Sequence, residues 1–356
     1  MLKKSPLPVI EARGKPYDMG RMIGQRTASK AKIYRKGTAD AIKFYTGFDW
    51  PKAVEKAKMY LPYAEEFNPD HVQELEGFAA GSKIPFDELF TLCCHELLSP
   101  GGFKGCTDII ANGDITEKGN VLAAHNEDWS GDQLSTVVLL HAKPKGKPEF
   151  LCTSYAGLIP SCGMNSSGIS ITGNALSPND LRVGIPKIFP IRKVLEARRI
   201  GEAMEWAMPE GRASSYNNIV CDKNGEMYSL EGSATDCAPL YAIDGYMVHT
   251  NHYTAERMHK FESYPDSLTC SNFRYNRALR LLEDQLGAVT PQSLGSILRD
   301  HINKPCSICR HPQPHVHPLD ISETIFSVIF DVTNLEAHVL KGKPCSGDYV
   351  MRSIRE

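Results

Sequence analysis

The sequence predicts an α+β protein built from layers of helices and sheets, and three observations lead to this prediction. The first hundred of its 356 residues have helical composition and periodicity. After Ser99 the pattern changes to short β-rich runs separated by turn signals. Strands and helices do not alternate steadily, which argues against a Rossmann sheet or a TIM barrel. We therefore expect one compact unit whose helical N-terminal third packs on the rest.

Four helical segments are predicted before Ser99. The first is rich in Ala, Lys, Arg and Gln, and Pro51 opens the second at a position where a first helical turn tolerates proline. Asn68 and Pro69 precede the third, and Pro85 and Asp87 introduce a fourth whose apolar positions fall on one helical face. The predicted segments are 24–45, 50–67, 72–81 and 87–98.

Antiparallel strands dominate the prediction for the remainder of the chain. Turn sequences at 165–168, 223–225 and 244–245 stand where hairpin connections are expected. The main β-rich runs are 106–112, 120–127, 135–142, 149–157, 168–175, 217–222, 225–232 and 324–332, and further helices are predicted at 191–207, 271–286 and 291–302.

Composition restricts the class of partner. The chain has 40 Lys and Arg against 42 Asp and Glu, a formal net charge of −2, so it shows no electrostatic footprint for nucleic acid or an anionic membrane surface. No run approaches the ~18 apolar residues of a membrane span. The first ten residues are too short and too proline-broken for a signal peptide. We expect a cytoplasmic protein whose partner is a small molecule or another protein.

Eleven cysteines, an odd number, are scattered over the chain. This pattern argues against a disulfide framework, so most of them should be reduced, buried thiols. Cys106 differs from the others because a glycine-rich segment, 101–105, leads directly into it and a β-run begins there. The sequence therefore singles out Cys106 as the cysteine to test for chemistry.

Three polar clusters can accompany this thiol. If the strand of Cys106 pairs with 120–126, Asp128 in the sequence HNEDW returns close to the sulfur. The run 248–253 ends a β-segment with Asn251, whose amide could donate a hydrogen bond to an oxyanion. The run 306–311 places Arg310 in a loop before the last strands.

These motifs together resemble the acyl-coenzyme A:6-aminopenicillanic acid acyltransferase family. The resemblance rests on Gly105-Cys106, HNEDW at 125–129, VHTNHY at 248–253, Ser271-x-x-Arg274, SICRH at 307–311 and KGKPC at 341–345. Family members are N-terminal-nucleophile enzymes, related more distantly to choloylglycine (bile salt) hydrolases and penicillin V acylases. The resemblance covers nearly the whole chain and implies a four-layer αββα fold.

The resemblance also implies a mechanism. Family members cut their own precursor at the Gly-Cys bond, here Gly105-Cys106, giving fragments 1–105 and 106–356 that stay associated as one structural domain. The freed α-amino group, with an ordinary pKa of about 7.7–8.0, would then activate the Cys106 thiol. The implied reaction is hydrolysis of, or acyl transfer from, a small N-acyl amide or acyl thioester such as an acyl-CoA. No metal or other cofactor is implied, and a homo-oligomer is compatible with the family.

The family's functional positions carry over residue by residue. Asp128 would hold the new α-amino group, Asn251 would donate to the oxyanion, and Arg274 and Arg310 match basic positions. Of the two, Arg310 is preferred as the residue that orients Cys106 or the substrate carbonyl. Asn126 and Asn174 are secondary candidates. His125 departs from the bile salt hydrolases, which carry arginine there, so the orienting network is expected to be wired differently.

Other interpretations of the same sequence remain. Cys306, Cys309 and the three histidines His311, His315 and His317 have the residue types of a zinc site, which would make this region a metal-stabilised module. A papain-like pair of Cys106 with His249 or His252 would act without cleavage of the chain. The chain could also be a non-catalytic binding protein that retains the fold; otherwise His95, His249 and His252 are expected to be hydrogen-bonded packing residues.

Overall fold

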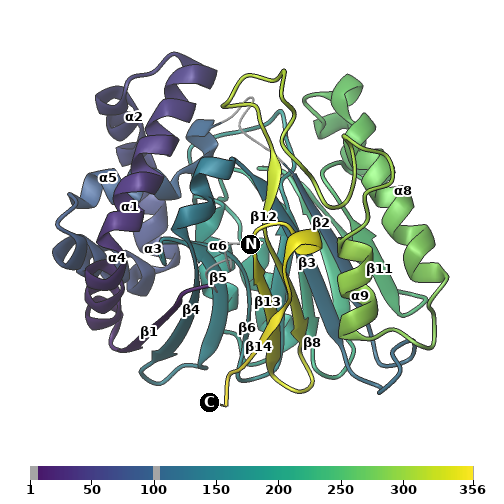
Figure 1. Ribbon diagram of the computed structural model, residues 1–356. Coiled ribbons are helices and arrows are strands. Elements are labelled where there is room, and N and C mark those ends of the chain that lie inside the picture. The colour runs from purple at the N-terminus through teal and green to yellow at the C-terminus, as the bar shows by residue number, and fades with distance from the viewer. Residues whose placement is uncertain (1–6, 99–104, 356) are drawn as a thin grey trace.

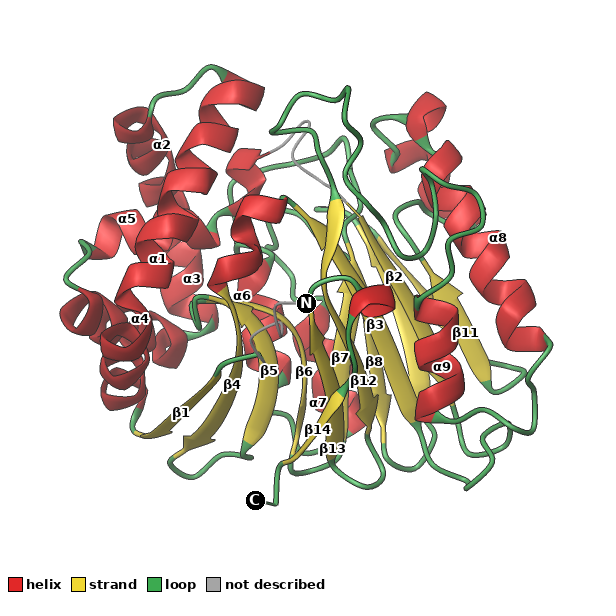
Figure 2. Ribbon diagram, in the orientation of Figure 1, coloured by secondary structure: helices red, strands yellow, loops and turns green. Residues whose placement is uncertain are grey.

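Two β-sheets lie face to face between two helical layers in the computed structural model, which describes residues 7–98 and 105–355 (Figures 1 and 2). Contacts between β7 of one sheet and β2 and β3 of the other join the two inner faces. This arrangement confirms the predicted αββα layers. The sheets have eight strands in the order β1-β4-β5-β6-β7-β8-β9-β10 and six in the order β11-β2-β3-β12-β13-β14.

The strands of the eight-stranded sheet are β1 (Val9–Gly14), β4 (Val137–Pro144), β5 (Phe150–Tyr155), β6 (Ile159–Asn165), β7 (Ile169–Asn174), β8 (Asn217–Asp222), β9 (Met227–Gly232) and β10 (Cys237–Tyr241). Those of the six-stranded sheet are β2 (Gly105–Ala111), β3 (Leu122–Trp129), β11 (Tyr246–His249), β12 (Glu323–Asp331), β13 (Glu336–Lys341) and β14 (Val350–Ser353). All pairings between these named strands are antiparallel except that of β1 with β4.

The helices divide between the two outer layers. Five lie in the N-terminal region: α1 (Pro16–Thr46), α2 (Trp50–Ala57), α3 (Leu61–Phe67), α4 (Pro69–Ser82) and α5 (Phe86–Cys93). Helices α1, α6 (Ile188–Val194) and α7 (Ile200–Ala207) contact the eight-stranded sheet, whereas α8 (Thr269–Glu283) and α9 (Pro291–Leu298) contact the six-stranded one. Shorter 3₁₀ turns lie at Lys58–Tyr60, His95–Leu98, Gly131–Thr136, Glu256–Phe261, Pro265–Ser267 and Pro344–Ser346.

Alternation along the central strands divides the core into two parts. Ile110 and Ala123 point into the large core that includes the space between the sheets. Their neighbours Ile109 and Ala124 point to the other face, where they pack with Leu282 and other side chains of α8 and α9. Both faces of β2 and β3 are therefore buried, which places the polar side chains at the ends of these strands inside the protein.

Several predicted boundaries are corrected by local breaks. The segment predicted as one helix over 50–67 is interrupted by a 3₁₀ turn before Pro62, and the segment 191–207 separates into α6 and α7. Strands β1, β6, β10, β13 and β14 were not among the predicted runs. β1 follows the proline-broken start, and Pro160 and Gly163 obscure β6. The turn at 244–245 does not close a hairpin, because β10 and β11 belong to different sheets.

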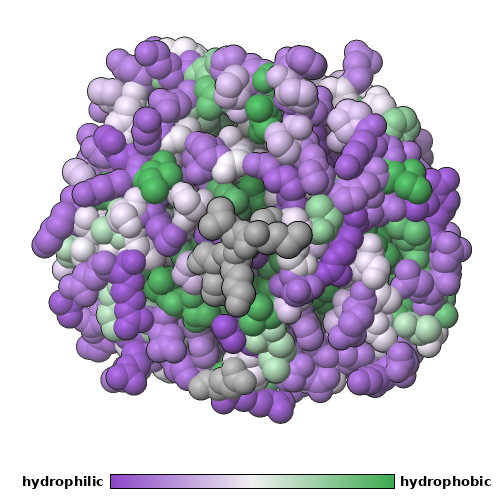
Figure 3. Space-filling view, in the orientation of Figure 1, coloured by the Kyte–Doolittle hydropathy of each residue, from purple (hydrophilic) through white to green (hydrophobic). Residues whose placement is uncertain are grey.

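The surface seen in Figure 3 is mostly hydrophilic, with smaller hydrophobic patches between hydrophilic side chains. Within the described residues, no helix has both the length and the apolar character needed to cross a membrane.

Helices α1 and α4 approach each other closely through glycines. A Cβ atom added to Gly77 would lie 2.0 Å from the carbonyl oxygen of Tyr17, and one added to Gly20 would lie 1.7 Å from that of Glu74. Gly24 and Gly81 continue the contact, at 2.4 and 2.2 Å from the facing carbonyl oxygens. These glycines let the two helix backbones touch, which no larger residue permits.

Gly77→Ala should therefore lower the free energy of unfolding by about 1–3 kcal/mol, because the added methyl group forces the helices apart. Chemical denaturation of the uncut chain measures this change. Gly201→Ala in α7 is the matched control, since nothing lies within 4 Å of its added Cβ; it should be neutral or stabilising by up to about 1 kcal/mol. Equal effects of the two substitutions would contradict the close-contact interpretation.

Candidate functional site

The antiparallel pairing of β2 and β3 brings the predicted nucleophile and acid together. Gly105 lies opposite Asp128, and Cys106 lies opposite Glu127. The Cys106 side chain is buried at the start of β2, with 6% of the residue exposed. The predicted hairpin is confirmed, and it places Asp128 opposite Gly105, the residue before Cys106. Residues 101–104 of the glycine-rich approach lie outside the described part of the chain.

The main chain of Cys106 is held on both sides. Its N–H donates to Oδ1 of Asn251 at 2.9 Å, and its carbonyl oxygen accepts a hydrogen bond from the guanidinium of Arg274. Arg274 also donates to Oδ1 of Asn251 at 2.7 Å and to the hydroxyl of Thr107 at 3.0 Å. Burial lowers the pKa of Arg274 to about 10 while the carboxylate of Asp128 opposes this change. Cys106 is thus fixed in place before any reaction.

Three charged side chains surround the α-carbon of Gly105. A Cβ atom at this position would lie 3.0 Å from Nη1 of Arg310, 3.3 Å from Oδ2 of Asp128 and 3.4 Å from Nη2 of Arg274. A larger residue would crowd these groups beside the Gly105-Cys106 bond. The charges therefore gather at this peptide bond, which is the predicted cleavage point.

Asp128 is completely buried. Burial raises the pKa of Asp128 to about 6, although the cations of Arg310 and Arg274 oppose the rise. Its Oδ1 accepts a hydrogen bond from Thr324 at 2.6 Å, and Oδ2 has no hydrogen-bond partner among the described residues. Thr324 in turn accepts from the backbone N–H of Arg310 at 2.9 Å, so one hydroxyl aligns the acid and the arginine.

The thiol faces an acidic environment. Sγ of Cys106 lies 3.9 Å from Oε2 of Glu127. Burial, and then the nearby carboxylates of Glu127, Asp108 and Asp128, raise the pKa of Cys106 well above its ordinary value; the backbone N–H of Ala175, which donates to the sulfur, acts in the opposite direction. The thiol of the uncut chain is therefore protonated near neutral pH.

Glu127 is a candidate site residue that sequence reasoning missed. Its carboxylate accepts hydrogen bonds from Tyr155 at 2.7 Å, Ser161 at 2.9 Å and His125 at 2.9 Å. The predicted hairpin could have indicated this residue. It puts Glu127 opposite Cys106, and side chains of residues that lie opposite each other in an antiparallel pair point to the same face of the sheet.

His125 links two buried acids. Its Nδ1 lies 3.0 Å from Asp108 and its Nε2 lies 2.9 Å from Glu127. Burial disfavours the imidazolium, but these two carboxylates outweigh it and raise the pKa of His125 to about 10. The side chain of His125 is therefore a cation. The orienting network was expected to differ from that of the bile salt hydrolases, and here it contains an imidazolium that binds two carboxylates.

A pocket of about 590 Å³, counted with its open mouth, begins at Cys106. Its walls are largely aromatic and aliphatic, and Glu127 is the acidic side chain among them. The lining includes His95, Trp129, Tyr155, Ile159, Ile188, Ile191 and Tyr216. Such a cavity suits a small, mostly apolar group with one polar function.

The other predicted residues lie as follows. Asn126 donates to the carbonyl oxygens of Leu298 and Ile308, so it ties the end of α9 and the loop before β12 to β3. Asn174 accepts from Asn217 and His249. Both amides are buried and serve neighbouring groups, not the thiol. The two arginines lie at different points: Arg274 donates to the carbonyl oxygen of Cys106, whereas the guanidinium of Arg310 lies beside Gly105. The preference for Arg310 as the orienting residue stays a prediction.

The papain-like pair finds no support in the hydrogen bonding of the histidines. Nδ1 of His249 lies 3.0 Å from Oδ1 of Asn174 and its Nε2 lies 2.8 Å from Glu231, so both nitrogens are occupied. Nδ1 of His252 faces the hydroxyl of Ser271 at 2.8 Å. His95 contacts the hydroxyls of Tyr34 and Tyr216. These histidines have the packing role expected for them, although His95 also lines the pocket.

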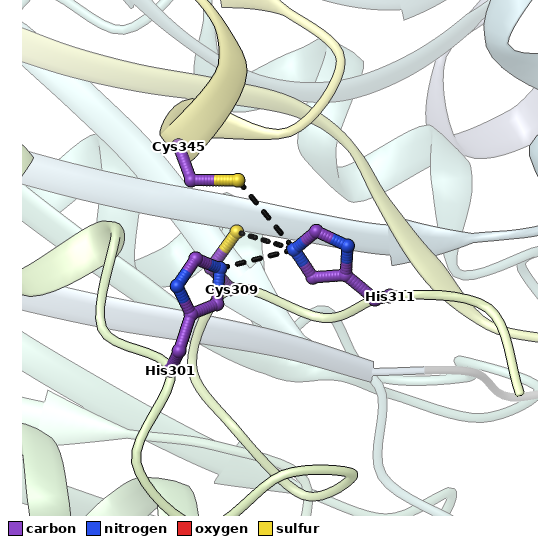
Figure 4. A group of neighbouring side chains, drawn as sticks. All are labelled: His301, Cys309, His311 and Cys345. Carbon is purple, nitrogen blue, oxygen red and sulfur yellow. Dashed lines mark hydrogen bonds between the residues drawn. The ribbon is translucent and has the colours of Figure 1, made fainter.

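The structure brings together only some of the zinc ligands that the sequence suggested. Cys306 forms a disulfide with Cys270, which corrects its candidacy as a ligand. The other nine cysteines are free, as expected for most of the eleven. A disulfide is typical of oxidising compartments, so the cytoplasmic location stays a prediction. His317 stacks on Phe44, away from Cys309. Cys309 and His311 instead meet His301 and Cys345 (Figure 4).

A second group, Cys106, His125 and Glu127, also has ligand atoms within 4.8 Å of one another. Both ring nitrogens of His125 face carboxylates, so this group is better described as the surroundings of the nucleophile than as a metal centre.

The role of His125 gives a pH-dependent prediction. Its pKa is raised in the folded chain, so its contribution to stability is complete below pH 6.5 and is lost as the pH rises through about 10. In an uncut Cys106→Ala background, His125→Gln should lower the free energy of unfolding by about 3–5 kcal/mol at pH 6. The difference should shrink as the pH approaches 10.

Denaturation curves at several pH values measure this difference. His338→Gln on β13, where the pKa of the half-buried His338 is lowered, is the control that should lack the trend. A difference that stays constant from pH 6 to 10 would contradict the shared imidazolium.

Comparisons with known proteins identify a family model and several similar proteins. The family model described as acyl-coenzyme A:6-aminopenicillanic acid acyl-transferase matches residues 115–345. The 40 kDa form of the acyl-coenzyme A:6-aminopenicillanic-acid-acyltransferase of Emericella nidulans is 27% identical over 354 residues, which cover 95% of this chain and 94% of the relative. The β-alanyl-dopamine/carcinine hydrolase of Drosophila melanogaster is 28% identical over 225 residues, covering 56% and 57%.

A solved structure of a mutant conjugated bile acid hydrolase from Clostridium perfringens is also similar, with a TM-score of 0.49 and 10% identity over 70% of this chain and 96% of that one. The likeness is too weak to add to the argument. The family match, in contrast, spans more than half of the sequence and includes the region from β3 to the last loop. The chain therefore belongs to the acyl-coenzyme A:6-aminopenicillanic acid acyltransferase family of enzymes.

Proposed function

We propose that the chain cuts itself between Gly105 and Cys106, and that the new N-terminal cysteine then acts as the nucleophile of an amide hydrolase or N-acyltransferase. The observation that carries the proposal is the set of charged groups around this one peptide bond. Asp128, Arg274 and Arg310 surround Gly105, while Asn251 and Arg274 hold the Cys106 main chain. A thiol without a partner histidine needs such an arrangement to react with its own backbone.

In the self-cleavage step, Sγ of Cys106 attacks the carbonyl carbon of Gly105. The C–N bond breaks as the C–S bond forms, and the thiol proton passes to the departing nitrogen of Cys106. Water then hydrolyses the thioester, releasing the carboxylate of Gly105 and regenerating the thiol. Glu127, 3.9 Å from the sulfur, can carry the proton, and the cation of Arg310 beside Gly105 stabilises the oxyanion.

In the substrate reaction, the released α-amino group of Cys106 is the base. Oδ1 of Asn251 already accepts from this nitrogen, and Oδ2 of Asp128 is available to accept a second hydrogen. The nitrogen's remaining position can take the thiol proton as the sulfur attacks a substrate carbonyl. The acyl group then leaves to water or to an amine.

Asn251 meets Cys106 through its oxygen in the uncut chain, not through its amide hydrogens. Its Nδ2 donates one hydrogen to the carbonyl of Ala175, so the second hydrogen is the one that can serve as the predicted oxyanion donor. The backbone N–H of Ala175, which donates to the sulfur, is a further donor that the sequence did not indicate.

The pocket also suggests the class of acyl group. Oε1 of Glu127 accepts one hydrogen bond, from Tyr155, and so retains acceptor capacity toward a donor in the pocket. Aromatic walls beside a carboxylate favour a short acyl chain that carries a primary ammonium group. The Drosophila relative is named for β-alanyl-dopamine, whose acyl part carries such an amine, and this agrees with the proposed substrate class.

Cleavage at the proposed bond can be tested by intact mass. The purified wild-type chain should give two fragments that meet at Gly105/Cys106, whereas Cys106→Ala should remain uncut because it has no nucleophile. Gly105→Ala should be cut more slowly, since its methyl group would lie 3.0 Å from Arg310. Cys237→Ala, a half-buried cysteine on β10, is the control that should be cut normally. Full activity of an uncut chain would overturn the mechanism.

The role of Glu127 can be tested with two matched substrates, a β-alanyl amide and the propionyl amide that lacks the amine. The wild-type enzyme should prefer the β-alanyl amide. Glu127→Gln should reduce this ratio of kcat/KM by roughly ten- to a hundredfold, because a charge-assisted hydrogen bond is lost. Ser161→Ala, which removes a neutral partner of the same carboxylate, is the control and should keep the preference. An unchanged ratio in Glu127→Gln would exclude ammonium recognition by this carboxylate.

A further inference from the structure

Two histidines and two cysteines converge near the end of the chain, from three separate segments (Figure 4). His301 follows α9, Cys309 and His311 belong to the loop before β12, and Cys345 lies in the 3₁₀ turn Pro344–Ser346 after β13. All four ligand atoms lie within 4.8 Å of one another. We call these four residues the Cys₂His₂ cluster.

Distances within the cluster are close to those around a tetrahedral ion: both nitrogen–sulfur distances fall in the expected range, and the nitrogen–nitrogen distance is slightly shorter. Nε2 of His311 lies 3.0 Å from Nε2 of His301, 3.8 Å from Sγ of Cys309 and 3.5 Å from Sγ of Cys345. Zinc binds sulfur at about 2.3 Å and imidazole nitrogen at about 2.0–2.1 Å, so the ligand atoms of a tetrahedral site lie roughly 3.3–3.8 Å apart.

Hydrogen bonding alone does not account for this arrangement. Nε2 of His311 faces three polar atoms, but an imidazole nitrogen has either one hydrogen to donate or one lone pair to accept with. A cation at the centre of the cluster would bind all four ligand atoms at once. We therefore propose that the Cys₂His₂ cluster binds one Zn²⁺ ion.

The identity of the ion follows from the donors. Two thiolates and two imidazoles are the soft and intermediate ligands that favour zinc, whereas magnesium and calcium require oxygen. Two thiolates also balance the charge of a divalent ion. Because the protein supplies all four ligands, no position remains for substrate or water, and the site is structural, not catalytic.

The surrounding backbone is organised for this task. The N–H of Cys309 donates to the carbonyl of Asp300 at 3.0 Å, next to His301, and Ser307 donates to the carbonyl of Cys309 at 2.7 Å. Arg299 donates to the carbonyl oxygens of Pro344 and Gly347, on both sides of Cys345. The three segments are thus joined by hydrogen bonds that do not involve the ligand atoms.

The ion would also act on the reaction site through Arg310, which lies between the ligands Cys309 and His311. This consequence rests on the proposed function. By fixing both neighbours of Arg310, the ion would hold the guanidinium beside Gly105. Arg310 would touch the reacting bond, and the Cys₂His₂ cluster would have a positioning role.

Zinc content is best measured on the uncut Cys106→Ala chain, so that the result does not depend on cleavage. This background also removes Cys106 from the other group of candidate ligands in the described residues. Protein purified under reducing conditions without chelator should contain one zinc per chain by mass spectrometry of the elements. Cobalt added to the zinc-stripped protein should give the d–d and thiolate charge-transfer bands of a tetrahedral Cys₂His₂ site.

Cys345→Ser and His301→Asn should lose the zinc and the cobalt spectrum. Both residues are at least partly exposed, so the substitutions should leave the fold intact, which circular dichroism can verify. His317→Asn and Cys237→Ser are matched controls outside the cluster and should keep one zinc. Chelation should lower the Tm of the parent and of these controls, but not that of Cys345→Ser.

Two results would overturn the proposal. One is a chain that neither contains zinc nor gives the tetrahedral cobalt spectrum; the other is equal zinc content in Cys345→Ser and in the controls. A disulfide between Cys309 and Cys345 in the reduced preparation would count as the first result. For the positioning role, zinc should restore self-cleavage in a chelated precursor with Cys106 intact, but not in its Cys345→Ser variant; equal cleavage with and without zinc would refute that role alone.

Discussion

The structure depends on the burial of opposite charges around one peptide bond. Asp108, Glu127 and Asp128 lie beside His125 and Arg274, and all five are almost inaccessible to solvent. Arg310 adds a sixth charge at Gly105. Three acids and three bases compensate one another, which is the condition under which charged groups are tolerated in a protein interior. Removal of one partner leaves another buried and uncompensated, so the site and the stability of the sheet cannot be separated.

The pairing of β2 with β3 could be predicted from the sequence because it is local. A cysteine at the start of one β-run and an acid at the end of the next are brought together by any simple hairpin. The αββα layers could also be predicted, since the change from helical to β-rich patterns at Ser99 is abrupt. Strand β1 could not be predicted in this way, because its partner β4 begins more than a hundred residues later and runs parallel to it.

Contacts between segments that are far apart in the chain could not be predicted from the sequence. Arg274 and Arg310 were both identified, but which of them touches Cys106 depends on how α8 and the loop before β12 pack on the six-stranded sheet. The sequence correctly placed Asn251 beside Cys106. It suggested that the amide would act as a donor, but the oxygen of the amide is the atom that faces the nitrogen of Cys106. His301 and Cys345 had no spacing that joined them to Cys309, and the disulfide between Cys270 and Cys306 had no signal among eleven cysteines.

The reaction site is assembled from parts that the ribosome makes at very different times. Arg274 lies 168 residues after Cys106, whose carbonyl it binds, and Thr324 lies 196 residues after Asp128. β12, the neighbour of β3, is among the last strands to be synthesised. A nascent chain that has just exposed Cys106 therefore lacks the groups that hold it. Under the proposed mechanism, the late synthesis of these groups would delay reaction at this bond until most of the chain has been made.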